Sequence, residues 1–470
     1  MDLACWIAGE RVGADAKLTV RSPFSGEIVG AVPMLSRRET EAAIGAALAN
    51  RTQLTRFERS QVLTRAAALI AARAEEFARL ISSESGLCLR DTRYEVGRAL
   101  DVLRFSSIEA LRDDGQIFSC DVSAQGKARK IFTLREPHAV VAAITPFNHP
   151  LNQVLHKIAP AVAVGAPVVL KPSEKTPLTA IRAVEVFHEA GLPPELLNIV
   201  LGPVAETAEI LVRDPRVEVV SFTGSIEIGK AIASAAGYKK LVLELGGNCP
   251  LIVCADADLD VAARLAAEGS FRNSGQRCTA VNRILVEAAV LDSFTERLVA
   301  VAREYRSGDP LDEATRVGCV INEASAERLE RLTADAVRKG AKLLLGGTRR
   351  GALFSPAVVS DVPREAELVA REAFGPIASI VAVQDLDDAI TLSNATPYGL
   401  SAGVVTRSLE SATRAVKAIR AGTVNVNEVP GYRLESSPFG GIKDSGLGIK
   451  EGVIEAMKCM SWVKTFSLPW

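Results

Sequence analysis

Two residues in the sequence have the type and setting of a nucleophile and a general base: Cys278 and Glu244. Cys278 lies in Gly-Gln-Arg-Cys-Thr, and the neighbouring Arg277 is a cation of the kind that favours a reactive thiolate. Glu244 lies in the apolar segment Leu-Val-Leu-Glu-Leu, where burial would raise its pKa and make it a usable base near neutral pH. Each residue alone also fits a simpler interpretation: Cys278 could be an inert loop cysteine, and Glu244 could form an ion pair at a strand end.

Polar residues follow the apolar segments before residue 245 at the points where each segment ends. In open parallel sheets, ligands bind beyond the carboxyl ends of the strands, so these residues should share one crevice. They lie at 145–148, 171–174, 223–225 and 244, and they include an amide, a lysine and a glycine turn before a helix. The turn Phe-Thr-Gly-Ser would let a pyrophosphate approach a helix N-terminus, although it is not a Gly-x-Gly-x-x-Gly motif and an ordinary strand–helix turn would look similar.

The elements that position these residues form an α/β pattern. Apolar strands alternate with helices from 138 to 245, which predicts a parallel sheet covered on both faces. A second series begins at Pro250 and predicts a second α/β domain. The first 110 residues look helical, with the helices expected at 37–50, 55–84 and 91–111. An alternating pattern at 115–136 predicts a hairpin, with which a strand at 462–466 could pair.

Composition excludes several classes of protein. The chain has 470 residues, with 55 Lys and Arg against 56 Asp and Glu, so it lacks the basic excess of a general nucleic-acid binder. Any anion that it binds must be held by local cations. No apolar stretch is long enough to span a membrane, and the N-terminus does not resemble a secretory signal. Eight scattered Cys without a Cys-x-x-Cys pair argue against a metal site or disulfide framework and fit a cytoplasmic location.

Six motifs in order resemble the aldehyde dehydrogenase superfamily, and the resemblance covers nearly the whole chain. The motifs are Pro-Phe-Asn-His-Pro at 146–150, Lys-Pro-Ser-Glu at 171–174, Phe-Thr-Gly-Ser at 222–225, Leu-Glu-Leu-Gly-Gly at 243–247, Gly-Gln-Arg-Cys at 275–278 and Glu-Ala-Phe-Gly-Pro at 372–376. The resemblance implies a Rossmann-type NAD-binding domain (1–116 and 136–245), a second α/β catalytic domain (246–437) and a small β oligomerisation element (117–135 and 455–470). It also implies a homodimer or homotetramer.

The same resemblance implies the catalytic roles. Cys278 would attack an aldehyde carbonyl, while the Asn148 side chain and the Cys278 backbone N–H hold the oxyanion. Glu244 would activate water to hydrolyse the thioester. Lys157 matches a family position near this proton path, although a solvated helix lysine is the simpler interpretation. A non-catalytic scaffold and a CoA-acylating enzyme are the alternatives, and the presence of both Cys278 and Glu244 speaks against them.

The implied cofactor is NAD, with NADP as the weaker possibility. Lys171 and Glu174 match the residues that hold the adenosine ribose, and the Glu174 carboxylate would repel a 2′-phosphate. Ser225 should contact the pyrophosphate, Glu372 the nicotinamide ribose and Phe374 the nicotinamide. The further cofactor positions are Thr145, Pro146, Phe147, Ser173, Gly224, Gly229 and Leu245. One departure from the family pattern is Arg371, which precedes the retained Glu372 where an acidic residue is usual.

Substrate preference is expected to follow from basic residues at family positions that line the substrate tunnel. These positions hold Arg98, His149, Arg277, Thr279 and Arg433. Guanidinium groups bind phosphate-like oxygens in bidentate fashion, so converging arginines would suit a compact dianion. Within the superfamily, the sequence looks most like the members that oxidise phosphonoacetaldehyde to phosphonoacetate in aminoethylphosphonate breakdown. Glyceraldehyde 3-phosphate, succinate semialdehyde and sulfoacetaldehyde are the alternative substrates.

Overall fold

A seven-stranded sheet forms the centre of the first of two α/β bodies in the computed structural model, which describes residues 1–469. Five parallel strands make up most of it: β7 (Val141–Ile144), β8 (Val168–Lys171), β9 (Leu197–Ile199), β10 (Val219–Thr223) and β11 (Lys240–Glu244). Their order, β11-β10-β7-β8-β9, changes direction between β7 and β10. In sheets of this kind, the ligand crevice opens at that point.

Helices cover both faces of this sheet, which explains why its strands are continuous apolar runs. One face carries α2 (Arg56–Ala72), α3 (Ala74–Ser85), α4 (Leu89–Glu109), α5 (Asn152–Val164), α6 (Pro177–Glu189) and α15 (Val453–Cys459). The other face carries α1 (Arg37–Ala49), α7 (Ala208–Arg213) and α8 (Ile226–Ala235). The single helix expected at 55–84 is two helices, because the backbone leaves helical geometry at Arg73, where φ is −113°.

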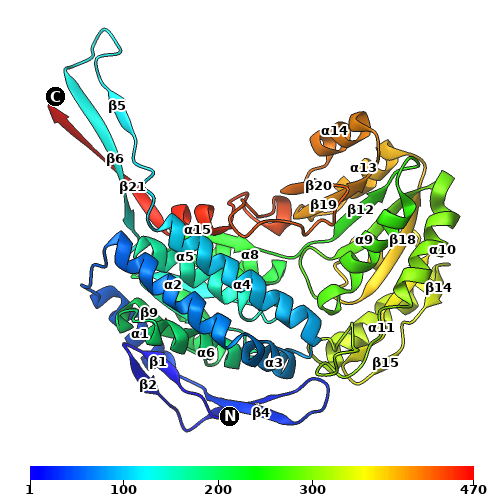
Figure 1. The fold of residues 1–470 in the computed structure, drawn as a ribbon, viewed down its shortest axis with the longest axis horizontal. Coiled ribbons are helices and arrows are strands. Elements are labelled where there is room, and N and C mark those ends of the chain that lie inside the picture. Colours follow the sequence, from blue (N-terminus) through cyan, green and yellow to red (C-terminus); the bar gives the residue numbers. More distant parts are fainter. Residues whose placement is uncertain (470) are drawn as a thin grey trace.

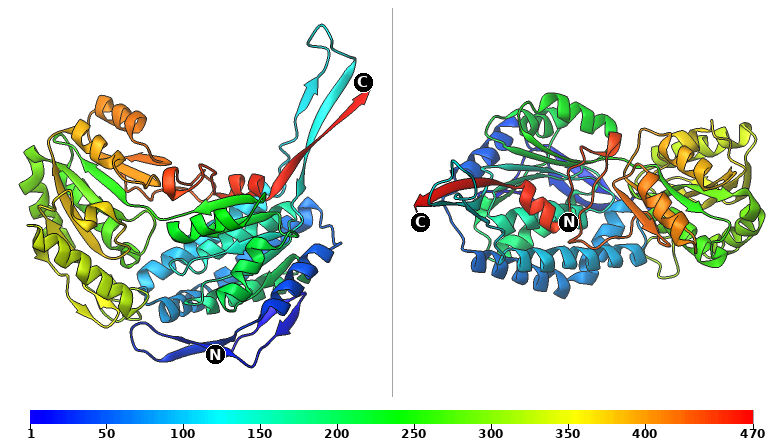
Figure 2. Two further views of the ribbon diagram at one scale, coloured as in Figure 1. Left: turned by 180° about the vertical axis from the view of Figure 1, so that it is seen from behind. Right: turned by 90° about the horizontal axis from the view of Figure 1, so that it is seen from above.

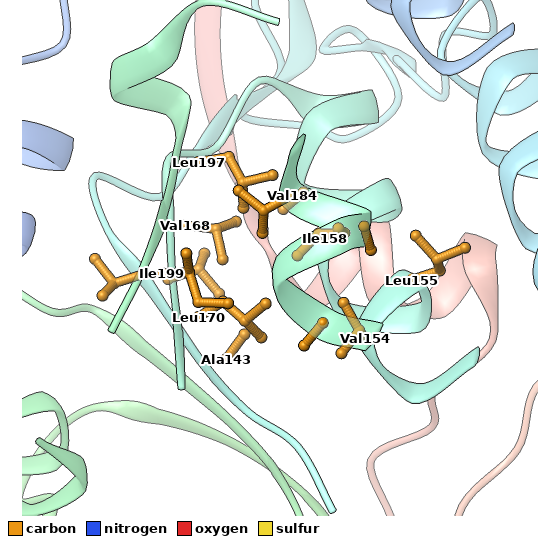
Figure 3. Packing of buried hydrophobic residues seen from close by; sticks show 14 of the residues in the cluster. Ala143, Val154, Leu155, Ile158, Val168, Leu170, Val184, Leu197 and Ile199 are labelled. Atoms are coloured by element: carbon orange, nitrogen blue, oxygen red, sulfur yellow. The ribbon is translucent and has the colours of Figure 1, made fainter. Parts of the chain in front are cut away.

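The core of the first body packs around α5, whose apolar side chains meet those of the neighbouring strands. Figure 3 shows Val154 and Ile158 of α5 beside Val168 and Leu170 of β8, all of them buried. Full burial of one such side chain contributes roughly 1.5–3 kcal/mol to the free energy of folding, so this layer holds α5 firmly on the sheet. The segment just before α5 carries Asn148, so its position depends on this packing.

A second seven-stranded sheet forms the other body and confirms the predicted second α/β unit. Its strands are β14 (Lys342–Leu345), β17 (Ala357–Ser360), β18 (Ile377–Val383), β13 (Val281–Glu287), β12 (Cys249–Val253), β19 (Ser401–Val405) and β20 (Thr423–Val426), in that order. The helices are α9 (Leu259–Phe271), α10 (Leu291–Ala302), α11 (Glu323–Arg338), α12 (Glu367–Ala370), α13 (Leu386–Asn394) and α14 (Leu409–Ala418). The two-stranded ribbon β15 (Arg349–Arg350) and β16 (Leu353–Phe354) lies beside α11.

A β arm projects from the first body, and the C-terminal strand forms part of it (Figures 1 and 2). The arm consists of β5 (Ile117–Ser119), β6 (Arg129–Pro137) and β21 (Ser461–Pro469), with β6 in the middle. β21 pairs antiparallel with β6 along the length of both strands, so the predicted pairing of the C-terminus with the hairpin is confirmed. No helix within residues 1–469 is long and apolar enough to cross a membrane.

The prediction that the first 110 residues are helical is wrong for the first 36. These residues form the strands β1 (Cys5–Ile7), β2 (Glu10–Val12), β3 (Lys17–Arg21) and β4 (Ile28–Pro33). β1 and β2 extend the first sheet as antiparallel edge strands joined at Ala8-Gly9, where both residues have positive φ. Strands of three to six residues are too short to give a clear alternating pattern, so the helix-rich sequence after residue 37 dominated the prediction.

Candidate active site

The strand ends that the sequence singled out lie side by side on the first sheet. β8, β7, β10 and β11 are consecutive neighbours, and the pairs Ile144–Lys171 and Thr223–Glu244 are in register. Asn148 follows β7 directly. The structure therefore brings the amide, the lysine, the glycine turn and the carboxylate to one edge of the sheet.

The loop that carries Cys278 is held in an unusual backbone conformation. Asn273, Ser274 and Gly275 all have positive φ, at 58°, 50° and 66°. Gly275 is required here, because a Cβ atom at this position would lie 2.1 Å from the carbonyl oxygen of Gly375. Such a loop persists only when its surroundings fix it, and strained loops of this kind cluster at functional sites.

Hydrogen bonds tie the Cys278 loop to the Asn148 loop. The Asn148 side chain donates from Nδ2 to the Gln276 carbonyl oxygen at 2.8 Å, and Asn273 Nδ2 donates to the Asn148 carbonyl oxygen at 3.0 Å. An amide nitrogen carries two hydrogens, so Asn148 keeps a second donor. The two loops therefore form one unit that presents a thiol and an amide donor together.

Glu244 ends β11 as a buried carboxyl group without a partner. Neither of its oxygens has a hydrogen-bond partner in the described structure, and only 4% of the residue is exposed. Burial raises the pKa of Glu244 well above its usual value, and the nearby Glu451 carboxylate raises it further. The Glu244 carboxylate in turn contributes, after burial itself, to raising the pKa of the Cys278 thiol to about 12. A buried carboxyl group and a buried thiol, both with raised pKa values, thus share this site.

Lys157 is not a solvated helix lysine, because its side chain is fully buried. The ammonium group donates to Ser221 Oγ at 2.8 Å and to Glu451 Oε1 at 2.9 Å. Lys157 lowers the pKa of Glu244, whereas Glu451 raises it, so both groups lie close to the base. Lys157 and Glu451 therefore form a buried charge pair near the Glu244 carboxyl group.

The basic residues expected in a substrate tunnel gather around His149, and two of them, Arg277 and Arg433, also lie near Cys278. Arg98, Arg277 and Arg433, together with Arg272, each lower the pKa of His149, after the larger effect of burial. Arg433 also lowers the pKa of Cys278 and of Glu244. Its guanidinium group stacks on the Phe439 ring, 3.8 Å from the ring centroid.

Arg277 and Thr279 flank the nucleophile but differ in what they contact. Arg277 donates from one terminal nitrogen to the carbonyl oxygens of Glu268 and Gly269, at the end of α9, while its Nε has no partner in the described structure. Part of its guanidinium group therefore supports the α9–Cys278 connection. Thr279 packs against Gly431, where a Cβ atom would lie 2.4 Å from the threonine hydroxyl, so it fixes the loop that leads to Arg433.

The glycine turn before α8 lies beside this site, and its glycines allow the helix to pack closely against the strand ends. Ser225 caps α8 by accepting a hydrogen bond from the Ile228 backbone N–H. A Cβ at Gly229 would lie 2.5 Å from the Leu245 side chain, so glycine lets α8 pack directly on the strand end. Two threonine hydroxyls at neighbouring strand ends, those of Thr145 and Thr223, are buried without partners.

Two aromatic rings, one ion pair and one side-chain hydrogen bond complete the crevice. Lys171 pairs with Glu174 at 2.7 Å, and Ser173 Oγ accepts a hydrogen bond from the Lys175 backbone. Phe147, which follows Pro146 in the chain, meets Phe374 edge to face, and the two ring centroids are 5.9 Å apart. Phe374 adopts a positive φ of 48°.

Glu372 lies against the glycine pair that follows β11. Its Oε1 accepts a hydrogen bond from the Gly247 backbone N–H at 3.2 Å, and a Cβ at Gly246 would lie 2.6 Å from its Oε2. Burial raises the pKa of Glu372 to about 8. The carboxyl group therefore faces the same crevice from the second body.

Comparison with known proteins decides which family this arrangement represents. The model of the aldehyde dehydrogenase family matches residues 9–466. The chain belongs to the aldehyde dehydrogenase family. It is 38% identical over 457 residues to a 3-sulfolactaldehyde dehydrogenase of Priestia aryabhattai, covering 97% of this chain and 96% of the relative.

Two further relatives agree with this aldehyde dehydrogenase assignment. The mitochondrial succinate-semialdehyde dehydrogenase of Arabidopsis thaliana is 39% identical over 443 residues, covering 93% of this chain and 83% of the relative. The solved NADP-dependent glyceraldehyde-3-phosphate dehydrogenase of Bacillus halodurans C-125 is 34% identical with a TM-score of 0.96, covering 100% of this chain and 99% of that one. The predicted family, fold and class of enzyme, an oxidoreductase that acts on aldehydes, are therefore confirmed.

Three residues of this aldehyde dehydrogenase site were not found from the sequence. Glu451 pairs with Lys157, Glu435 contacts Arg98, and Asp91 accepts a hydrogen bond from the Asn273 backbone N–H at 2.7 Å. Each acidic residue lies far along the chain from its partner, in a segment with no distinctive motif. Each is a single acidic residue in a stretch of mixed composition, a pattern that is too common in the sequence to single out a site.

Proposed function

We propose that this aldehyde dehydrogenase uses NAD to oxidise a small aldehyde with a doubly charged anionic group, and that phosphonoacetaldehyde, oxidised to phosphonoacetate, is the substrate. The observation that supports this proposal most strongly is that Arg98 and Arg433 meet at the Glu435 carboxylate, with Arg277 and Arg433 near Cys278. Three relatives bear the names of anionic aldehydes: 3-sulfolactaldehyde, succinate semialdehyde and glyceraldehyde 3-phosphate.

The charge balance of the arginine cluster (Arg98, Arg277 and Arg433) favours a dianion. Glu435 is the carboxylate that contacts Arg98 and Arg433, and the charges around it hold its pKa below the usual range despite burial. His149 is neutral, because burial and the nearby arginines lower its pKa well below the usual value. Glu435 is the one carboxylate in ion-pair contact with these arginines in the described structure, so the cluster carries an excess of positive charge that suits an anion. A phosphonate carries about two negative charges above its second pKa, whereas a sulfonate or carboxylate carries one.

The residues of the crevice fit NAD. Lys171 and Glu174 would hold the adenosine ribose, the Glu174 carboxylate disfavours a 2′-phosphate, and the Ser225 turn at the N-terminus of α8 suits a pyrophosphate. The unpartnered Thr145 and Thr223 hydroxyls leave polar groups for a ligand to satisfy. When bound, NAD supplies the acceptor for the hydride that leaves the substrate carbon.

In the proposed mechanism, the Cys278 thiol gives its proton to solvent, and the resulting thiolate bonds to the aldehyde carbon while the carbonyl electrons move to the oxygen. The free Asn148 N–H and the Cys278 backbone N–H stabilise the oxyanion, a contribution that is typically about 2.7–4 kcal/mol for one such donor. Departure of hydride leaves a thioester on Cys278. Glu244 then takes a proton from water, the water oxygen attacks the thioester, and the C–S bond breaks to release the acid. The Lys157–Glu451 pair adjusts the pKa of Glu244 for this step.

A substrate panel with NAD tests this proposal directly. The kcat/KM values for phosphonoacetaldehyde, 3-sulfolactaldehyde, glyceraldehyde 3-phosphate, succinate semialdehyde and propanal are compared. Phosphonoacetaldehyde should exceed propanal by about 100-fold, because a buried charge pair commonly contributes 2–5 kcal/mol when one partner is removed. A higher value for propanal would refute the anion site, and a higher value for another anionic aldehyde would replace the proposed substrate.

Replacement of a cluster arginine separates substrate binding from chemistry. Arg98→Met should raise the KM for phosphonoacetaldehyde far more than the KM for propanal. Arg104 lies on the same helix with its side chain 69% exposed, so Arg104→Met is the matched control and should change neither value. An equal loss on both aldehydes in the Arg98 variant would assign it to the fold instead.

We also propose that the β arm (β5, β6 and β21) pairs with a second copy of the chain. The arm exposes a group of large apolar side chains: Ile117, Phe118, Ile131, Trp462, Val463, Phe466 and Leu468. An exposed apolar edge of this kind favours association over solvation. A homodimer or homotetramer would cover it through the same patch on each copy.

A further inference from the structure

Glu435 is a buried carboxylate to which the proposed mechanism gives no role, and it lies at the centre of the substrate arginines. Only 4% of its side chain is exposed. The Nε of Arg98 donates to Glu435 Oε1, and a terminal nitrogen of Arg433 lies 3.8 Å from Glu435 Oε2. One carboxylate thus contacts two of the three arginines that surround the expected position of the substrate anion.

The second oxygen of Glu435 is held from behind by a buried histidine. His156 Nε2 lies 2.6 Å from Glu435 Oε2, and the imidazole is almost completely buried on α5. Because a carboxylate only accepts hydrogen bonds, His156 donates from Nε2. The Glu435 backbone carbonyl also accepts a hydrogen bond from the Val453 N–H at 3.0 Å. The carboxylate is therefore fixed from both α5 and the chain that leads to α15.

The contacts leave the outer parts of both guanidinium groups available. Within the described structure, Arg98 uses only its Nε for hydrogen bonding, so both of its terminal nitrogens remain free. Arg433 stacks on Phe439, which fixes the plane of its guanidinium group. An anion that bridges two guanidinium groups needs them at a defined mutual angle, because bidentate hydrogen bonds are directional.

We infer that Glu435 is a positioning residue for substrate selection: it holds Arg98 and Arg433 in the orientation that binds the anionic group of the aldehyde, while His156 fixes the carboxylate. This inference rests on the proposed anionic substrate. Glu435 acts through the two arginines and not on the reacting atoms. Its removal therefore affects recognition of the anionic end and leaves the chemistry at Cys278 intact.

The test measures KM and kcat separately for phosphonoacetaldehyde and for propanal in Glu435 variants of the full-length enzyme. Glu435→Ala removes the acceptor for Arg98 and should raise the KM for phosphonoacetaldehyde by about tenfold or more, as the loss of outer partners commonly does. The kcat for both aldehydes and the KM for propanal should stay within about threefold. Glu435→Gln keeps an oxygen for Arg98 Nε, so it should restore much of the wild-type KM.

Two further variants protect this test against misfolding and indirect effects. Glu435→Asp withdraws the carboxylate by one methylene and should raise the same KM, so it replaces the alanine variant if that protein does not fold. Glu428 is an acidic residue of the same C-terminal segment that contacts the Val429 backbone, and Glu428→Ala should change nothing. In an Arg98→Met/Arg433→Met background, Glu435→Ala should give no further rise in KM, because its effect passes through these arginines.

Each result bears on one proposal. If wild-type enzyme does not prefer anionic aldehydes over propanal, the proposed function fails first. If wild-type enzyme does prefer them and Glu435→Ala keeps the same KM within twofold, the inference about Glu435 is refuted. An equal loss of kcat/KM on phosphonoacetaldehyde and propanal would also refute it, since that pattern belongs to a residue that supports the fold or the nucleophile.

Discussion

Replacing Glu244 with Gln should separate the two halves of the catalytic cycle. The carboxyl group has no hydrogen-bond partner in the described structure, so the isosteric amide breaks no contact. The variant loses only the capacity to accept a proton. Because the Glu244 carboxylate contributes to the raised pKa of Cys278, its removal should lower that pKa and should not slow attack by the thiol.

The size of the effect follows from the role of a general base. Such a residue typically contributes about 10²–10⁴-fold to the rate, which is roughly 3–5 kcal/mol of activation free energy. We expect the steady-state rate of Glu244→Gln to fall within this range, since water attack on the thioester depends on the base. The free energy of unfolding at pH 7 should change by less than about 1 kcal/mol, because no net hydrogen bond is lost.

Rapid mixing with saturating NAD and phosphonoacetaldehyde provides the assay. The variant should release NADH in a burst of about one equivalent per active site and then turn over slowly, because the thioester accumulates. Intact-mass analysis of the quenched protein should show the acyl group, and Cys278→Ser should show none. Absence of the burst with NAD binding intact would mean that Glu244 acts before hydride transfer. An unchanged steady-state rate would mean that another group activates water.

The remaining predictions concern the oxyanion, the pKa of Glu244, the cofactor and the arm. Asn148→Ala should lower kcat about 10²–10³-fold in steady-state assays, as loss of an oxyanion donor does; a change in KM alone would contradict that role. Lys157→Met should shift the acidic limb of the kcat pH profile to higher pH and Glu451→Gln should shift it to lower pH, since Lys157 lowers and Glu451 raises the pKa of Glu244; parallel shifts would refute the assignment. Glu174→Gln should improve kcat/KM for NADP relative to NAD by about tenfold, because a like-charge contact is removed. Deletion of β21 (Ser461–Pro469) should yield monomers by light scattering, whereas an unchanged mass would place the interface elsewhere.

The fold could be predicted from sequence wherever an element was long or its apolar pattern regular. The parallel strands β7 to β11 carry continuous apolar runs, because both of their faces are covered, and all of them lie in the segment 138–245 that was predicted to alternate between strands and helices. The strands before residue 37 were missed, since their pairing depends on distant partners: β1 pairs with β9, some 190 residues away. A local pattern cannot report a contact of that range.

The candidate site, too, could be predicted from the sequence only in part. Cys278, Glu244 and Asn148 lie in motifs where residue type and neighbours are informative, and the structure brings all three to one crevice. Glu435 and Glu451 lie in segments that carry no such signal. Each is identified only by the buried cation it meets, Arg98 in one case and Lys157 in the other. Buried charge pairs are a tertiary property, so sequence reasoning can find the charged residue that belongs to a motif but not the partner that neutralises it.

These buried acids explain how one site can hold so much charge. A lone buried ion is costly, whereas a paired one is tolerated. Lys157 is paired by Glu451 and Arg98 by Glu435, but within residues 1–469 the Glu244 carboxyl group and the Cys278 thiol have no side-chain partner, and burial raises the pKa of both. Under the proposed mechanism, the groups that change protonation are therefore the unpaired ones, whereas Lys157 and Arg98, which keep their charge to tune Glu244 and to hold an anion, are paired. Pairing thus separates the binding charges of this enzyme from its reacting groups.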